Sequence, residues 1–318
     1  METTLHPNIL DCWFLTGATA SGKTATSLLL AEALDAEIIS LDSMSIYRGM
    51  DIGTAKPTAE DQARIPHHLI DLVDPTETFS VSQYRDRAHE KIDELRSRGK
   101  SVLFVGGTPL YLKSLLHGIF EGPPADWEFR REIEAEIAEH GIGVLHERLK
   151  MIDPLSAHKL HPNDQRRMIR ALEVYRATGQ PISHLQTHFE EAHATEDCRV
   201  FALHWERPLL HERIDQRVES MFKQGLTQEV EGILRDYGEL SHTAAQAVGY
   251  QEVISHLNGD LPLEQSVDTV KQRTRQFARR QETWFRALKE CRWVERTLDD
   301  QPEALVDEIL KAGATANR

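Results

Sequence analysis

Eight residues near the N-terminus have the types and spacing of a phosphate-binding loop. The segment GATASGKT, residues 17–24, has two glycines separated by four residues and followed by Lys and Thr, which is the P-loop pattern. Such glycines let backbone N–H groups converge on phosphate oxygens, and the next helix directs its N-terminal dipole at the anion. The lysine adds a positive charge, and the hydroxyl can ligate Mg²⁺. The residues predicted to bind a di- or triphosphate are Gly17, Ala18, Thr19, Ala20, Ser21, Gly22, Lys23 and the metal ligand Thr24.

Asp42 is the first candidate for further chemistry beside the phosphate. It follows the apolar stretch AEIISL, residues 36–41, so it should project near the P-loop. There it could hold Mg²⁺ through water, act as a general base, or stabilise a turn. Its position does not choose among these three roles.

A second glycine loop ends another apolar stretch, SVLFV at residues 101–105. Gly106 and Gly107 either let a ligand or a helix approach the backbone closely or form an ordinary turn. In the first case, the hydroxyl of Thr108 would face the same cleft.

The elements that must position these residues alternate as in an α/β protein. The periodicity predicts strands at 11–16, 36–41 and 101–105 and helices at 23–34, 80–98 and 109–117. Such units favour a P-loop NTPase-like core, in which helices flank a parallel sheet and the loops gather at its carboxyl edge. The P-loop, Asp42 and Thr108 would share that edge.

The composition changes after GPPAD, residues 122–126, where the sequence becomes rich in charged residues and in predicted helix. We predict a small helical insertion domain at 122–163 and a core formed by 1–121 and 164–318. In the second part of the core, a helix should begin after Asn163 or Asp164 and end before Gly179. A strand at 201–205 follows, and the remaining helices are expected at 208–224, 227–237, 245–257, 263–289 and 302–312.

Composition indicates a cytoplasmic protein. No apolar run approaches the ~20 residues that a membrane span needs, and the N-terminus has no secretory signal features. The cysteines, Cys12, Cys198 and Cys291, are far apart, which favours a reducing compartment over disulfides or a zinc cluster. The sixteen histidines have no metal-ligand spacing. Nothing demands a partner chain, so we expect a monomer.

Charge is segregated along the chain. The net charge of −14 argues against a polyanionic partner. However, residues 271–286 carry six cationic residues and one Glu, and residues 165–176 are rich in Arg. These segments form either a basic groove for a polyanion or solvated helix faces with ion pairs.

Seven segments, taken together and in order, resemble the tRNA dimethylallyltransferases, also called tRNA isopentenyltransferases. They are GATASGKT, EIISLDSMSIYRGMDIGTAKP, HHLIDLVDP, VGGTPLYL, HPNDQRRMIRALEVYRATG, QAVGYQE and TRQFARRQETWFR. They span about residue 13 to about residue 290, and DSMSIYRGMDIGTAKP is the most specific. Four residues differ from the common family pattern. Pro109 stands where the family commonly has Gly, and Gln251 stands where Arg is common. Met44 and Ser45 replace the small or apolar pair that usually follows Asp-Ser.

The resemblance implies transfer of a dimethylallyl group from dimethylallyl diphosphate to N6 of the adenosine immediately 3′ of the anticodon. The tRNAs concerned read codons that begin with U. Diphosphate leaves with the help of Mg²⁺, the P-loop, Lys23 and Thr24, while Asp42 takes the amine proton. Thr108 would contact the flipped adenine.

The resemblance also implies residues that contact the anticodon stem-loop of the tRNA. Arg130 would reach it from the insertion, and Arg275 and Arg280 would help to line a backbone groove. The predicted tRNA contacts are Asp42, Ser43, Met44, Ser45, Thr108, Arg130, Gln165, Arg166, Arg167, Met168, Ile169, Gln246, Tyr250, Gln251, Arg273 and Arg279.

Three other functions compete with this one. A P-loop kinase of a small metabolite would need ATP, and it leaves the basic C-terminal helix without a role. An isopentenyltransferase of free adenine nucleotides would not need an anticodon-recognition surface. A tRNA-binding protein with a vestigial P-loop would be expected to lack Lys23, Thr24 or Asp42, and all three are present.

Overall fold

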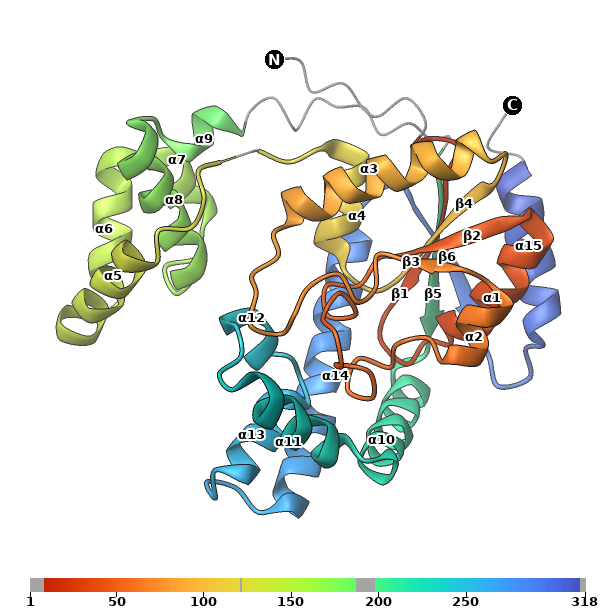
Figure 1. Ribbon diagram of the computed structural model, residues 1–318. Coiled ribbons are helices and arrows are strands. Elements are labelled where there is room, and N and C mark those ends of the chain that lie inside the picture. The colour runs from red at the N-terminus through yellow and green to blue at the C-terminus, as the bar shows by residue number, and fades with distance from the viewer. Residues whose placement is uncertain (1–8, 121, 187–197, 315–318) are drawn as a thin grey trace. The chain divides into compact units, whose positions relative to one another are not determined.

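The computed structural model describes residues 9–120, 122–186 and 198–314, which divide into two compact units (Figure 1). Of these residues, 117–120 and 122–186 form the smaller unit, and the others form the larger one. None of the described helices is long and apolar enough to cross a membrane.

The larger unit is built on one sheet of six parallel strands in the order β3-β2-β4-β1-β5-β6. This arrangement confirms the predicted parallel sheet flanked by helices. Two of its strands were not predicted, because β3 has only two residues and the edge strand β6 buries only Val294. The strands are β1 (Trp13–Gly17), β2 (Ala36–Ser40), β3 (His67–His68), β4 (Ser101–Val105), β5 (Arg199–Trp205) and β6 (Cys291–Arg296).

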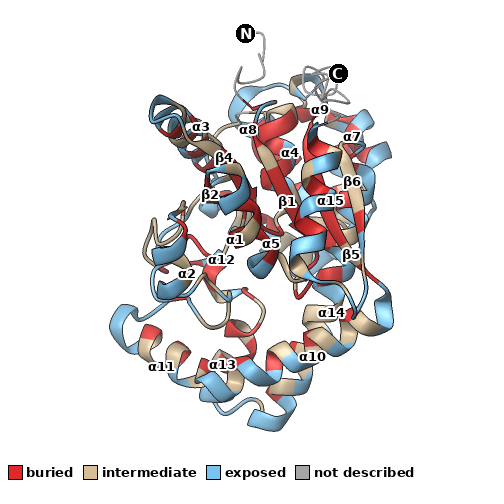
Figure 2. Cartoon of the chain, turned by 90° about the vertical axis from the view of Figure 1, so that its right-hand side faces the viewer, coloured by how far each residue is buried: buried red, intermediate tan, exposed pale blue. Residues whose placement is uncertain are grey.

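Helices flank the sheet in the places that the sequence predicts. α1 (Lys23–Leu34) follows the P-loop, and its buried residues pack in one apolar cluster with those of α15 (Pro302–Ala314). α3 (Val81–Ser97) begins with a capping box at Ser80, and α4 (Pro109–His117) starts with a proline in its first turn. The short α2 (Ala59–Arg64) was not predicted. Figure 2 shows the buried residues concentrated in the strands and on the inner faces of these helices.

Five helices between β5 and β6 complete the larger unit. The predicted helix 245–257 begins only at Tyr250, because Gly249 before it has a φ of 98°, and a separate short helix ends at Ala245. The long α14 follows, and its buried side chains pack against α10. The helices are α10 (Arg207–Gln224), α11 (Leu226–Tyr237), α12 (His242–Ala245), α13 (Tyr250–Leu257) and α14 (Leu263–Ala287).

Helices are the regular secondary structure of the described part of the smaller unit. This unit extends beyond the predicted insertion at 122–163. α8 belongs to it rather than to the core, because Met168 and Leu172 pack in the same apolar cluster as Phe129 and Ile133. Asp164 caps α8 and Gly179 ends it, as predicted. The helices are α5 (Trp127–His140), α6 (Gly143–Ile152), α7 (Pro154–Lys159), α8 (Gln165–Thr178) and α9 (Ile182–Leu185).

Candidate functional site

The P-loop connects β1 to α1, and side-chain donors hold its carbonyl oxygens. Lys23 Nζ donates to the carbonyls of Gly17 at 3.0 Å and Ala18 at 2.7 Å. Arg213 Nε donates to Ala20 O, and Trp205 Nε1 donates to Ser21 O, each at 2.9 Å. Four consecutive or nearly consecutive carbonyls thus have partners, which fixes the conformation of the loop.

The two glycines of the P-loop pattern are required by the backbone. Gly17 and Gly22 have φ angles of 136° and 93°, which favour glycine. A Cβ at Gly17 would also lie 2.6 Å from the carbonyl oxygen of Leu203 in β5. Gly22 leads directly into α1, so the helix N-terminus begins at Lys23, where its dipole favours an anion.

Lys23 lies in one electrostatic cluster with Arg217 and Asp42. Burial lowers the pKa of the Lys23 ammonium to about 7; the charge of Arg217 lowers it further, and that of Asp42 opposes the change. Burial also lowers the pKa of Arg217, again opposed by Asp42. The structure therefore brings the predicted Lys23 and Asp42 together and adds a second cation, which suits a di- or triphosphate.

Sequence reasoning missed Arg217. It lies on α10, 175 residues from Asp42 in the numbering, between the buried residues Ile214 and Val218. An arginine beside two buried positions of one helix was the available signal, since a cation that is turned partly inward needs an anionic partner. No motif placed it at the P-loop.

Two more arginines lie close to the P-loop. Arg213 and Arg296 lie over the ring of buried Trp205, at 4.4 Å and 5.3 Å from its centroid. Burial lowers the pKa of Arg213, and the neighbouring Arg296 adds to this effect. Arg296 is paired with Asp300 at 3.1 Å. Positive charge is thus concentrated around the loop in a chain whose net charge is −14.

Asp42 stabilises a turn with one of its carboxylate oxygens. Oδ1 accepts from the backbone N–H of Met44 at 2.8 Å, so the predicted turn role is present. Among the described residues, none donates a hydrogen bond to Oδ2, which leaves that oxygen available to a ligand or a proton. The turn therefore orients the carboxylate without consuming it.

Thr108 lies beside the same turn. Its Oγ1 accepts from the N–H of Ser43 at 3.0 Å. Gly106 must be glycine, because a Cβ there would lie 2.2 Å from the carbonyl oxygen of Leu41. The close approach at Gly106 is thus to Leu41, the residue after β2, and it brings Thr108 beside the turn at Asp42.

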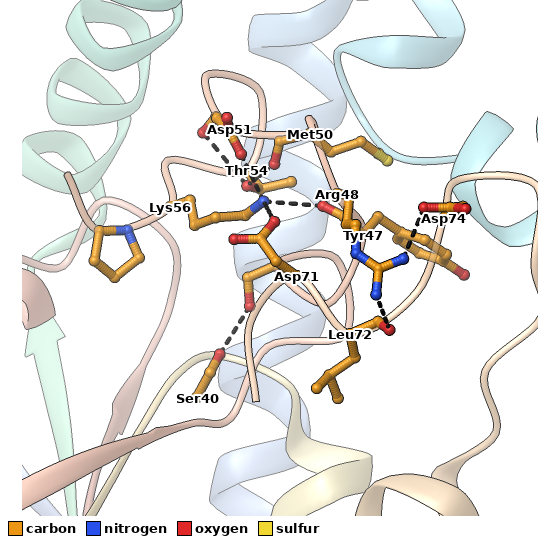
Figure 3. Close-up of polar contacts among 12 residues, drawn as sticks. Ser40, Tyr47, Arg48, Met50, Asp51, Thr54, Lys56, Asp71, Leu72 and Asp74 are labelled. Atoms are coloured by element: carbon orange, nitrogen blue, oxygen red, sulfur yellow. Dashed lines mark hydrogen bonds and ion pairs between the residues drawn. The ribbon is translucent and has the colours of Figure 1, made fainter. Parts of the chain in front are cut away.

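The loop at residues 43–57, the 43–57 loop, is held by a buried ammonium (Figure 3). Lys56 Nζ, on a side chain that is 3% exposed, donates to Tyr47 O at 2.9 Å and bonds Asp51 Oδ1 at 2.5 Å and Asp71 Oδ1 at 2.6 Å. Arg48 bonds Asp74 at 2.8 Å and the carbonyl of Leu72 at 2.9 Å. These contacts tie the segment after Asp42 to the segment after β3.

Glu229 on α11 anchors the tip of the 43–57 loop. Its carboxylate accepts from the N–H groups of Asp51, Ile52 and Gly53 at 3.1, 2.7 and 3.2 Å. It also accepts from the hydroxyl of Tyr250 at 2.5 Å, and the Tyr250 ring packs so closely on Gly53 that a Cβ there would lie 2.3 Å away.

We expect Glu229→Gln to destabilise the larger unit by about 1–3 kcal/mol, because it replaces a charged acceptor of four hydrogen bonds by a neutral one. Urea unfolding measures the change. Glu231→Gln, at an exposed position of the same helix, is the control and should change stability by less than about 0.5 kcal/mol. Equal unfolding midpoints for the two variants would contradict this role of Glu229.

Four of the predicted tRNA contacts are buried side chains. Met168 and Ile169 are 0% and 6% exposed in the core of the smaller unit. Tyr250 is 0% exposed and bonds Glu229, and Ser45 is 4% exposed with its hydroxyl 2.8 Å from that of Ser40. These side chains hold the fold together, and their burial leaves them no surface for contact with RNA.

The other predicted contacts in the smaller unit differ in their exposure and in whether they are already ion-paired. Arg130 forms a bidentate pair with buried Glu173, at 2.8 and 3.0 Å, so an RNA contact would compete with that pair. Arg166 and Arg167 are exposed at the start of α8, and Gln165 is half-buried.

The arginines of α14 also divide into two groups. Arg273 bonds Glu252 at 2.7 Å and the side-chain oxygen of Gln251, and Arg275 bonds Asp215 at 3.2 Å. Arg279 and Arg280 are exposed and have no ion pair among the described residues. A hollow of about 370 Å³ is lined by Gln276, Arg279, Arg280, Thr283 and Trp284. Gln246 is exposed on the loop after α12.

The pKa of Lys23 predicts that binding of a diphosphate takes up a proton. With a pKa of about 7, Lys23 is neutral in most molecules at pH 8. A bound anion favours the charged form of its ammonium group. Calorimetry with inorganic diphosphate at pH 8, in buffers of different ionisation enthalpy, should show uptake approaching one proton relative to Lys23→Met. At pH 6 the difference should vanish, because the lysine is already protonated. Equal uptake by both proteins at pH 8 would contradict the lowered pKa.

A P-loop at the carboxyl edge of a parallel sheet, with Lys23, Arg217 and Asp42 beside it, defines a P-loop protein of the α/β class. The family model described as IPP transferase matches residues 45–288. That match begins after the P-loop and Asp42, so it is independent of both. The chain belongs to the IPP transferase family.

Individual relatives agree with this assignment. A tRNA dimethylallyltransferase from Rhodopirellula baltica is 50% identical over 316 residues, which cover 94% of each chain. The crystal structure of a full-length tRNA isopentenylpyrophosphate transferase from Bacillus halodurans has a TM-score of 0.71 and 39% identity, covering 96% of this chain and 97% of that one. A eukaryotic dimethylallyltransferase acting on tRNA has a TM-score of 0.76 and 27% identity, covering 96% and 80%.

Proposed function

We propose that this protein transfers the dimethylallyl group of dimethylallyl diphosphate to N6 of the adenosine immediately 3′ of the anticodon, in tRNAs that read codons beginning with U. The observation that carries the proposal is the cluster of Lys23, Arg217 and Asp42 beside the P-loop. It combines two cations for a departing diphosphate with one carboxylate for the incoming amine. The protein's membership of the IPP transferase family supports the same reaction.

The leaving group determines what the P-loop side must do. As the C–O bond of the donor breaks, negative charge grows on the diphosphate, and preorganised donors lower the barrier by stabilising that charge. Lys23 and Arg217 supply positive charge at fixed positions, and the N-terminus of α1 adds its dipole. Protonated Lys23 is the form that does this work, so turnover should weaken where the bound complex loses that proton.

The amine end determines what Asp42 must do. An exocyclic amine conjugated to a purine is a weak nucleophile, and loss of its proton as the C–N bond forms favours the reaction. Asp42 Oδ2 is suited to receive that proton, because Oδ1 is held by the turn at Met44. The hydroxyl of Thr108, beside Ser43, would contact the adenine, which must leave its stack to reach the site.

Mg²⁺ fits the donors at this site. Thr24 presents an exposed hydroxyl in the first turn of α1, and Asp42 presents a carboxylate oxygen; oxygen ligands of this kind suit Mg²⁺. The described residues include no group of three or more His, Cys, Asp or Glu that could hold a metal ion, so the donor's phosphate oxygens would complete the shell. Bound Mg²⁺ would neutralise charge on the leaving diphosphate.

The anticodon stem-loop would contact both units. Arg166, Arg167 and Gln165 in the smaller unit are proposed contacts, together with Arg130 if it exchanges Glu173 for phosphate. Exposed Arg279, Arg280 and Gln246 in the larger unit would provide further contacts. Arg273, Arg275 and Gln251, which already have side-chain partners, are further proposed contacts. Ser43 and Met44 would line the adenine site. We further propose that the helical unit is a tRNA-contacting domain and that the protein acts as a cytoplasmic monomer.

One assay separates this function from its alternatives. The protein is incubated with labelled dimethylallyl diphosphate, Mg²⁺ and unmodified tRNA, or with AMP in place of tRNA. We expect label in tRNA and none in AMP, and a tRNA whose adenosine 3′ of the anticodon is replaced by guanosine should stay unlabelled. Label in AMP alone would indicate a free-nucleotide prenyltransferase. ATP-dependent phosphorylation of a small molecule without prenyl transfer would indicate a kinase.

A further inference from the structure

A buried glutamine on α14 joins the two loops that the proposed reaction uses. Gln281 is 4% exposed in the C-terminal part of α14, where the preceding residues Arg279 and Arg280 are exposed. Its Oε1 accepts from the backbone N–H of Thr19 in the P-loop at 2.9 Å. Its Nε2 donates to the carbonyl of Gly107, in the loop after β4, at 2.5 Å.

Gln281 bridges segments that are far apart in the sequence. In the sequence, Gln281 lies 262 residues after Thr19 and 174 residues after Gly107, its two hydrogen-bond partners. A buried primary amide needs both a donor and an acceptor as partners, and this one has them. Gly107 is also fitted to the bridge, because a Cβ there would lie 2.5 Å from Gln281 Nε2.

The bridge continues to the catalytic carboxylate. Gly107 precedes Thr108, whose Oγ1 accepts from the N–H of Ser43, and Ser43 follows Asp42. A connected path therefore runs from a P-loop amide through Gln281 to the turn that orients Asp42. It also means that the Thr19 N–H, one of the amides predicted to hold the diphosphate, already has a partner.

We propose that Gln281 is a positioning residue, which sets the separation between the leaving diphosphate and the Asp42–Thr108 end of the site. This inference rests on the proposed prenyl transfer. In a displacement at carbon, the leaving group and the nucleophile must be held in line, and a misplacement of about 1 Å costs about 100-fold in rate. Gln281 holds the loops at both ends without contacting either reactant.

Substitutions at this residue separate its two hydrogen bonds. Gln281→Leu removes both. Gln281→Glu keeps an acceptor for Thr19 but turns a carboxylate oxygen toward the carbonyl of Gly107, so only the protonated carboxyl can restore the second bond. Since burial and the facing carbonyl oxygen of Gly107 both favour the neutral form of the carboxyl, this restoration should occur as the pH is lowered toward 5.5. Gln272→Leu, at an exposed position of α14, is the matched control.

The experiment measures kcat and the two KM values of wild type and variants with tRNA and dimethylallyl diphosphate. Wild-type turnover tests the proposed function by itself, and the variants test Gln281 only after it is present. We expect Gln281→Leu to lower kcat by about 10- to 100-fold, with the KM for tRNA within about twofold and Gln272→Leu unchanged. The ratio of Gln281→Glu to wild-type kcat should rise at least fivefold between pH 8 and pH 5.5.

Two results would overturn the inference. One is a folded Gln281→Leu enzyme with a kcat within twofold of wild type. The other is a Gln281→Glu enzyme whose activity ratio to wild type is independent of pH, since a role in folding alone would lower activity by the same factor at each pH. If Gln281→Leu does not fold, the pH series of Gln281→Glu decides the question.

Discussion

Asp42→Asn should lower kcat for prenyl transfer by about 10²- to 10⁴-fold, the range that general-base catalysis contributes. The amide oxygen of Asn can still accept from the N–H of Met44, as Oδ1 of Asp42 does at 2.8 Å, so the turn should persist. What disappears is the basic oxygen that we propose receives the amine proton. Single-turnover measurements with saturating tRNA and donor test this step directly, and binding of tRNA should change by less than about twofold.

A control and a metal titration complete this test. Asp236→Asn changes an exposed aspartate whose carboxylate pairs only at the surface with Arg235, and it should leave kcat unchanged. If Asp42 acts through Mg²⁺ instead, a higher Mg²⁺ concentration should recover much of the loss in Asp42→Asn. Turnover of Asp42→Asn at the wild-type rate would exclude Asp42 from both roles.

Arg217→Gln should lower kcat/KM for dimethylallyl diphosphate by about 10²- to 10³-fold, comparable to removing one preorganised donor of an oxyanion site. The reason is its place beside Lys23 and Asp42, where its charge is strong enough to lower the pKa of Lys23. The KM for tRNA should stay within about twofold. Steady-state kinetics with each substrate varied in turn gives both numbers.

Arg217→Gln should also change the proton uptake that accompanies ligand binding. Because the charge of Arg217 lowers the pKa of Lys23, its removal should raise that pKa and reduce the proton uptake on ligand binding at pH 8. Arg235→Gln, at an exposed position of α11, is the control for loss of a surface cation. An Arg217→Gln enzyme with wild-type kcat/KM would show that the diphosphate does not contact this end of the cluster.

Local patterns predicted the parts of the site that the chain forms by itself. The P-loop at 17–24 needs only a strand, two glycines and a helix start, and all of these are adjacent in the sequence. Asp42 and Thr108 each end a strand of the same parallel sheet, so their meeting follows from the fold class. The helix caps at Ser80 and Asp164 were equally local.

Long-range packing decided what the sequence could not predict. Arg217 and Gln281 reach the P-loop from helices that follow it by almost 200 residues or more, and no periodicity specifies which face of those helices will meet it. Met168 and Ile169 sit on an amphipathic helix, where a resemblance indicated RNA contact but packing against Phe129 and Ile133 buried them. β6 was missed because a strand at the sheet edge with one buried residue has no clear alternation.

The order of the strands has a consequence for how the chain is made. β1 lies between β4 and β5, so Trp13 pairs with Leu103 on one side and with Arg199 on the other. When a ribosome has completed β4, it must still synthesise the whole smaller unit before the second neighbour of β1 exists. During that interval, the apolar strand Trp13–Gly17 has an open edge, and loop closure over such a span is slow. Nascent chains that stop before residue 199 should therefore be recognised by chaperones, and chains long enough for Trp205 to have left the ribosome should escape them.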